Sequence, residues 1–138
     1  LAAQIMVRQN SGLIVNISFY GGRHYFNNVA YGVNKAAIDR LSADMALELK
    51  PRGISAVTLY PGHVSTEGML ALAQVNPAID LSLMETPQFV GRCIAALAND
   101  EQVIAKTGQI LITAEVGAEY GITDVNGSQP ESLRAQLW

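Results

Sequence analysis

A tyrosine and a lysine stand four residues apart in the segment Tyr31-Gly-Val-Asn-Lys35. In a helix this spacing places both side chains on one face. A phenol with its ordinary pKa of about 10 exchanges protons poorly near neutral pH. A neighbouring ammonium favours the phenolate, so we expect Lys35 to lower the pKa of Tyr31 toward the range where proton transfer is effective. The pair predicts acid–base chemistry, although the same spacing also forms simple surface contacts in many helices.

Two further polar segments directly follow apolar runs. Ser18 ends the run Gly12-Leu-Ile-Val-Asn-Ile17, and Pro61-Gly-His-Val-Ser-Thr66 follows the run Ile54–Tyr60. Short apolar runs rich in β-branched residues are typical of strands that are covered on both faces of a parallel sheet. The carboxyl ends of parallel strands meet at one edge, where open α/β folds bind ligands. We therefore expect both segments to lie near Tyr31.

The apolar pattern alternates between helical and strand periods along the chain. Long crossovers between successive strands favour an α/β fold with a parallel, doubly covered sheet of three strands. The segment His63–Glu85 is irregular, and the tail after Val116 has no strong period. The predicted elements are a helix ending near Asn10, a strand over 13–18, a helix over 28–51, a strand over 54–60, a helix from Pro87 with Thr86 as its N-cap, and a strand over 108–113.

Composition narrows the class of protein. With 138 residues, 49% hydrophobic and 15% charged, the chain predicts one globular domain. Its net charge is −3 and its nine Lys and Arg are scattered, which argues against nucleic acid as a partner. The lone Cys93 excludes an internal disulfide and indicates a reducing compartment, so we expect a cytoplasmic protein. Neither a membrane-spanning stretch nor metal-ligand spacing is visible, so no metal is expected.

Three motifs occur together in a characteristic order and spacing: Asn16-Ile-Ser18, Tyr31-x-x-x-Lys35-Ala-Ala, and Pro61-Gly-x-Val-x-Thr66. They resemble the short-chain dehydrogenase/reductase family. The segments 31–41 and 118–127 resemble its branch named dehydrogenase/reductase family member one. The resemblance implies a Rossmann-type doubly wound sheet. It also implies hydride transfer between NAD or NADP and a small alcohol or carbonyl substrate.

The resemblance implies a role for each matched residue. Tyr31 would exchange the proton with the substrate oxygen, and Lys35 would lower its pKa and hold the nicotinamide ribose. Ser18 would donate a hydrogen bond to the reacting oxygen. The family often has a second serine, however, where Phe19 stands, and a shift of one residue aims a strand side chain at the opposite face. The residues expected to line the nicotinamide are Pro61, Gly62, Val64 and Thr66.

The family's glycine-rich pyrophosphate turn and the charged residue that selects NAD or NADP are not in this sequence. The first residue is Leu1, and residues 1–8 have the pattern of the middle of a helix. We expect residues 1–138 to be the C-terminal catalytic half of a single NAD(P)-binding domain. The activity would then belong to a longer parent protein, and the isolated segment would be inactive.

Three alternatives stay open. The protein is an enzyme, a non-catalytic relative that keeps the fold for binding or assembly, as Phe19 and the missing half suggest, or a free-standing α/β module. The helix over 28–51 is apolar on two sides, which indicates a subunit contact, so we expect a homodimer or homotetramer. Apolar residues around the irregular segment form either a substrate lid or ordinary packing: Met69, Leu70, Leu72, Met84 and Phe89.

Overall fold

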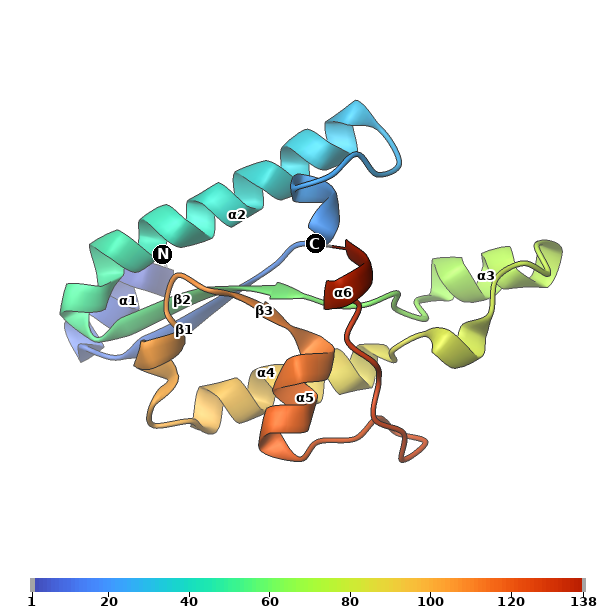
Figure 1. Cartoon of the computed structure of the whole chain (residues 1–138). Coiled ribbons are helices and arrows are strands. Elements are labelled where there is room, and N and C mark those ends of the chain that lie inside the picture. The colour runs from blue at the N-terminus through green and yellow to red at the C-terminus, as the bar shows by residue number, and fades with distance from the viewer. Residues whose placement is uncertain (1, 138) are drawn as a thin grey trace. The chain divides into compact units, whose positions relative to one another are not determined.

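The computed structural model describes residues 2–137 and divides the chain into two compact units. The first unit is formed by Leu1–Tyr60 and Leu97–Leu111, and the second by Pro61–Ala96 and Ile112–Trp138. Figure 1 labels the elements, which are α1 (Ala2–Gln9), β1 (Gly12–Ile17), α2 (Val29–Leu49), β2 (Ile54–Tyr60), α3 (Glu67–Val75), α4 (Pro87–Asn99), β3 (Ile110–Ile112), α5 (Thr113–Tyr120) and α6 (Arg134–Leu137).

The sheet has three strands in the order β1-β2-β3. Strands β1 and β2 are parallel, with a register that runs from Gly12 opposite Ile54 to Ile17 opposite Leu59. Every residue of β2 is buried, as expected for a central strand covered on both faces. The predicted α/β, Rossmann-type fold is confirmed, and the strand over 54–60 has the predicted bounds.

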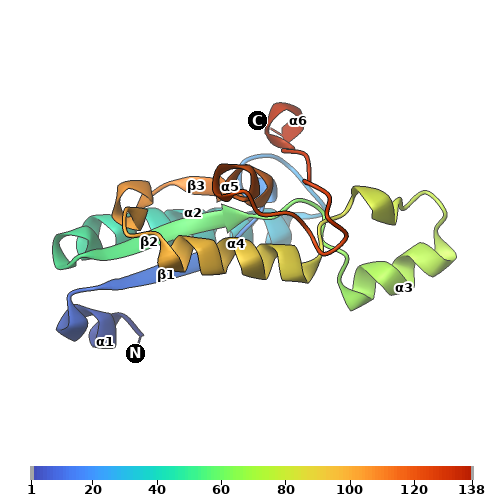
Figure 2. The ribbon, with the colours of Figure 1, turned by 90° about the horizontal axis from the view of Figure 1, so that it is seen from below.

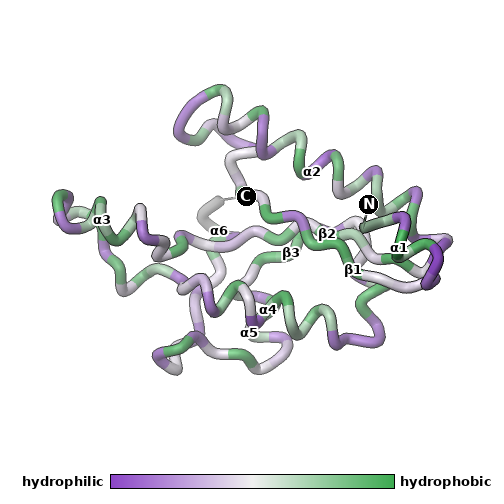
Figure 3. Tube along the Cα trace, turned by 180° about the vertical axis from the view of Figure 1, so that it is seen from behind, coloured by the Kyte–Doolittle hydropathy of each residue, from purple (hydrophilic) through white to green (hydrophobic). Residues whose placement is uncertain are grey.

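Helix α2 is the long helix predicted over 28–51. The Asn28 side chain caps it by accepting a hydrogen bond from the backbone N–H of Tyr31, at 2.9 Å. The helix runs along β1 and β2 (Figure 1). The buried Ser42 accepts a 3.0 Å hydrogen bond from the Asn16 side chain of β1. Hydrophobic and hydrophilic residues alternate along α2, as Figure 3 shows. Its second apolar stripe, which includes Val33 and Leu47, is exposed in this chain.

Several short helical segments were not predicted. Helix α3 and the 3₁₀ helix Leu81–Leu83 occupy the segment expected to be irregular, and α5 occupies part of the tail. Helix α3 has only nine residues, and its apolar side chains Leu70, Leu72 and Val75 are exposed, so it lacks the one-sided apolar pattern of a packed helix. Helix α5 follows β3 directly, without a separating turn.

Helix α4 begins as predicted, with Pro87 in its first turn. Thr86 Oγ1 accepts a hydrogen bond from the N–H of Phe89, at 3.1 Å. In the second unit α5 lies beside α4, as Figure 2 shows. A Cβ at Gly117 of α5 would meet the Phe89 ring at 2.5 Å, so glycine permits this close packing. Among the described helices, none combines the length and hydropathy that crossing a bilayer requires.

Candidate active site

Tyr31 and Lys35 lie in the first turns of α2 and share one face. The Nζ of Lys35 lies 5.5 Å from the centroid of the Tyr31 ring, within the range of a cation–π contact. The pKa of Tyr31 is nevertheless raised, first because the phenol is partly buried and then because the Tyr20 phenol is close. The expected lowering by Lys35 is therefore wrong for this structure, since sequence spacing places the ammonium near the ring but does not reveal the burial.

Ser18 and Phe19 follow β1 and are both buried, with 2% and 8% of their surface exposed. The Ser18 hydroxyl donates a hydrogen bond to the backbone carbonyl of Lys35, at 3.2 Å. The Phe19 ring instead stacks edge-on against Tyr20 and Phe26, with centroid distances of 4.7 and 5.4 Å. The hydroxyl of Ser18 thus fixes the turn of α2 that carries Lys35, while Phe19 points into an aromatic environment.

This aromatic cluster, made of Phe19, Tyr20, Phe26 and Tyr31, was not predicted. The Phe26 ring lies 5.2 Å from Tyr20 and 5.7 Å from Tyr31 between centroids. The 3₁₀ helix Tyr20–Gly22 carries the cluster onto α2, and a Cβ at Gly21 would meet the Tyr31 ring at 2.8 Å. The four Phe and Tyr residues in the loop over 19–26, three of which join the cluster, were the available signal. The cluster gives the Tyr31 phenol its apolar surroundings.

A second tyrosine, Tyr60, is hydrogen-bonded to α2 at Asp39, one turn beyond Lys35. The Tyr60 hydroxyl, at the end of β2, donates a short hydrogen bond to Oδ2 of Asp39. Burial, and then the hydrogen bond to the Asp39 carboxylate, strongly raise the pKa of Tyr60. The other oxygen of Asp39 is buried and has no hydrogen-bond partner. Tyr60 therefore keeps its proton and ties β2 to α2.

The Pro-Gly turn lies in the second unit. Pro61 is buried, Gly62 and Val64 are half-buried, and Thr66 is exposed. The N–H of Thr66 donates to the carbonyl of Val64, at 2.8 Å, and the Thr66 hydroxyl accepts from the N–H of Met69 to cap α3. The turn thus passes straight into α3, with the Thr66 hydroxyl hydrogen left to donate.

Glu85 is the buried partner of this turn and was not predicted as a site residue. Only 3% of its surface is exposed. Its two carboxylate oxygens lie 2.7 and 2.6 Å from the hydroxyl oxygen of Thr113, and the backbone N–H of Gly62 also donates to the carboxylate. Burial raises the pKa of Glu85, and the hydrogen bonds from Thr113 and Gly62 oppose that rise.

Asp124 lies in the segment 118–127 and has a structural role there. Its carboxylate accepts hydrogen bonds from the N–H and the hydroxyl of Thr86 and from the N–H of Val125. Burial alone would raise the pKa of Asp124, but these bonds and the charge of Arg92 together lower it. In the second unit, Asp124 therefore joins the tail to the N-cap of α4.

Cys93 is a free, fully buried thiol. Burial first, and then the charges of Glu85 and Asp124, raise its pKa to about 12. A thiol of this kind is not a nucleophile. Within residues 2–137, no group of three or more His, Cys, Asp and Glu is arranged to hold a metal ion.

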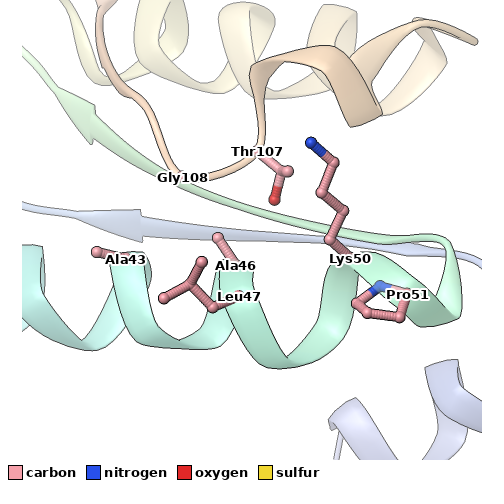
Figure 4. Close-up of a pocket in the computed structure, with 7 residues that line it drawn as sticks. All are labelled: Ala43, Ala46, Leu47, Lys50, Pro51, Thr107 and Gly108. Carbon is pink, nitrogen blue, oxygen red and sulfur yellow. The ribbon is translucent and has the colours of Figure 1, made fainter.

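The first unit also carries a groove that contains none of the predicted site residues. It has a volume of about 460 Å³ and lies between the end of α2 and the loop before β3 (Figure 4). The side chain of Lys50 extends along it toward Thr107. The residues that line it are Ala43, Ala46, Leu47, Lys50, Pro51, Thr107 and Gly108.

The parallel α/β fold and the ordered motifs are similar to those of the short-chain dehydrogenase family. The family model described as short chain dehydrogenase matches residues 1–76, and the chain belongs to this family. It is 40% identical, over 135 residues, to the human protein named dehydrogenase/reductase SDR family member 1. That match covers 91% of this chain and 43% of the human protein, so the chain spans less than half the length of this relative.

Two solved structures of similar fold carry nicotinamide cofactors. One is a variant of ElxO with NADPH bound, which is 26% identical with a TM-score of 0.70, over 81% of this chain and 48% of that one. The other is 4-hydroxyisoleucine dehydrogenase complexed with NADH, which is 27% identical with a TM-score of 0.62, over 80% of this chain and 48% of that one.

Proposed function

We propose that the protein is an NAD(P)-dependent oxidoreductase that transfers hydride between the nicotinamide and an alcohol or carbonyl carbon of a small molecule. The observation that carries the proposal is the position of the Tyr31–Lys35 pair. Ser18, the residue after β1, is hydrogen-bonded to Lys35, so the pair stands at the carboxyl end of a parallel strand. That edge is where open α/β sheets bind ligands. Membership of the short-chain dehydrogenase family supports the same chemistry.

The chain's own residues would move the proton and hold the cofactor. Tyr31 gives its phenolic proton to a carbonyl oxygen, or takes one from an alcohol. Burial, and then the nearby Tyr20 phenol, raise the pKa of Tyr31, so both favour the protonated phenol in this structure. The protonated form, which burial favours, is the form that reduction of a carbonyl needs.

The donors present fit NAD or NADP, and related structures carry NADPH and NADH. When bound, the nicotinamide supplies or accepts the hydride. Lys35 has N–H donors for ribose hydroxyls, and the Thr66 hydroxyl keeps its own hydrogen for a carboxamide oxygen because it accepts from Met69. The residues assigned to line the nicotinamide are Pro61, Gly62, Val64 and Thr66.

Ser18 is the proposed donor to the reacting oxygen. A hydroxyl has one hydrogen, and in this structure Ser18 donates it to the Lys35 carbonyl. To polarise a substrate, the hydroxyl must rotate away from that carbonyl. Phe19, in the position of the family's second serine, has no hydrogen to donate.

The chain would form the C-terminal catalytic half of one NAD(P)-binding domain. A preceding half would supply the glycine-rich turn for the pyrophosphate. The coverage of 43% of the human relative supports this arrangement. On this proposal the isolated residues 1–138 do not turn over substrate, and the intact protein does.

The intact protein would be a homodimer or homotetramer in the cytoplasm. The second apolar stripe of α2, in which Val33 and Leu47 are exposed, supports a contact between subunits. The lone reduced cysteine, Cys93, supports a reducing compartment.

A second candidate is a non-catalytic relative that keeps the fold for binding or assembly. Phe19 favours it, since an apolar ring of the aromatic cluster stands where the family often has a hydroxyl. The experiment that separates the two is a fluorescence titration of the intact protein with NADH and NADPH, followed by turnover assays over a panel of aldehydes, ketones and alcohols. Binding together with turnover supports the enzyme. Binding without turnover supports the second candidate, and failure to bind either nucleotide contradicts both the cofactor and the reaction.

A further inference from the structure

We propose that Glu85 is a positioning residue that holds the Pro61–Thr66 turn in the shape needed to receive the nicotinamide carboxamide. This inference rests on the proposed function, because that function assigns the turn to the cofactor. Glu85 would not touch the cofactor itself. It would act through the backbone of Gly62 and through the strand-like pairing of the turn.

The backbone of Glu85 pairs with the turn on both sides of Val64. The N–H of Glu85 donates to the carbonyl of His63, at 2.8 Å, and the carbonyl of Glu85 accepts from the N–H of Ser65, at 2.9 Å. Val64 and Glu85 thereby form an isolated parallel bridge. The Ser65 hydroxyl donates to the same carbonyl, at 3.1 Å. Three hydrogen bonds with the backbone of Glu85, one donated and two accepted, therefore fix the middle of the turn.

The side chain of Glu85 fixes the start of the turn. Its carboxylate accepts the N–H of Gly62 and lies within 2.7 Å of the Thr113 hydroxyl. A Cβ at Gly62 would stand 3.1 Å from Oε1 of Glu85, which is shorter than an ordinary van der Waals contact. The close approach explains why glycine suits this position.

Burying the Glu85 carboxylate costs free energy, because the charged group loses its hydration. A carboxylate with 3% of its surface exposed loses most of its hydration, and burial disfavours its charged form. An apolar residue would avoid that cost, but it would leave the Gly62 N–H and the Thr113 hydroxyl without this acceptor. The buried carboxylate thus lowers the stability of the folded state but holds the turn in one conformation. This is expected where a backbone must be positioned for a ligand.

The first experiment needs no cofactor. Amide hydrogen exchange of residues 61–66 would be measured in the intact protein for Glu85→Ala, Glu85→Gln and Thr113→Val. Glu115→Gln is the matched control, because its carboxylate also accepts hydrogen bonds in the second unit but pairs with Arg134. We expect exchange at Gly62 to quicken about tenfold or more in Glu85→Ala, with partial rescue in Glu85→Gln and no change in the control. Unchanged exchange at Gly62 in Glu85→Ala overturns the inference.

The second experiment links the turn to the cofactor. For Glu85→Gln and Thr113→Val, which keep side-chain volume and so protect folding, the Michaelis constant for NAD(P)H should rise about tenfold while that for the carbonyl substrate stays within about twofold. If amide exchange at Gly62 quickens but the Michaelis constant for the cofactor does not change, the Glu85 contacts have a structural role only and the inference is wrong. If the unaltered intact protein binds no NADH or NADPH, the proposed function fails, which the titration shows before any variant is made.

Discussion

The hydroxyl of Ser18 donates a 3.2 Å hydrogen bond to the backbone carbonyl of Lys35. This bond joins the residue that follows β1 to the helix turn that carries the proposed ribose-binding lysine. The same hydroxyl is the proposed donor to the reacting oxygen, and experiment can separate the two roles, since losing a structural bond and losing a polarising bond have different consequences.

Ser18→Ala should lower kcat/KM of the intact protein by about 10²–10³-fold, the cost of removing one donor to a developing oxyanion. The free energy of unfolding should fall by only about 1 kcal/mol, since one hydrogen bond to a backbone carbonyl is lost. Steady-state kinetics and urea unfolding measure the two quantities. Unchanged kcat/KM with the same loss of stability would leave Ser18 with the structural role alone.

Tyr60→Phe should destabilise the first unit. The substitution removes the hydrogen bond to Asp39, whose other carboxylate oxygen is already buried and without a hydrogen-bond partner. Leaving a buried carboxylate less satisfied costs about 1–3 kcal/mol of unfolding free energy. Tyr25→Phe is the control, because Tyr25 is 80% exposed and its loss should stay within about 0.5 kcal/mol. Equal unfolding midpoints for the two variants would contradict the assigned bond.

The ionisation of Glu85 should make the free energy of unfolding decrease as pH rises. Its pKa is raised above the ordinary 4.5, so the folded state binds the proton more tightly than the unfolded state does. Its contribution to stability is therefore fully present below the unfolded pKa and declines as pH rises through the raised folded pKa. Glu85→Gln should remove this decline. Urea unfolding at intervals from about pH 4 to pH 8 tests it, and identical pH profiles for both proteins would contradict the assignment.

Glu115 should behave in the opposite way. Hydrogen bonds from Arg134 and Ser132 lower its pKa, although burial acts against them. Its contribution is present above the unfolded pKa and is lost as pH falls through the lowered folded pKa. Because both partners are partly exposed, salt should weaken the effect. Glu115→Gln should accordingly flatten the acid side of the stability profile and leave the neutral side unchanged.

Cys93 should resist alkylation in the native protein. The thiol is fully buried and its pKa is raised to about 12, so almost no thiolate is present near neutral pH. Labelling with iodoacetamide at about pH 8 should proceed only after unfolding in urea. Rapid labelling of the folded protein would show that the thiol is accessible.

The sequence could predict the features that depend on local pattern. The apolar run of β2, the capped start of α4 and the long α2 all follow from periodicity and turn residues. The shared face of Tyr31 and Lys35 follows from helix geometry alone.

The remainder depends on contacts that the sequence does not show. Glu85 and Thr113 are 28 residues apart, and only the folded second unit makes them partners. The raised pKa of Tyr31 depends on its burial and on Tyr20, and both follow from how the loop over 19–26 folds onto α2. Helix α3 was missed because its apolar residues face outward and form no buried stripe.

The central claim is that Tyr31 carries the proton, and Tyr31→Phe in the intact protein tests it most directly. The substitution removes the hydroxyl and keeps the ring that packs on Phe26. We predict that kcat for NAD(P)H-linked reduction falls about 10²–10⁴-fold, while nucleotide binding and the unfolding midpoint match those of the Tyr25→Phe control. Turnover by Tyr31→Phe at the rate of the control would contradict the account.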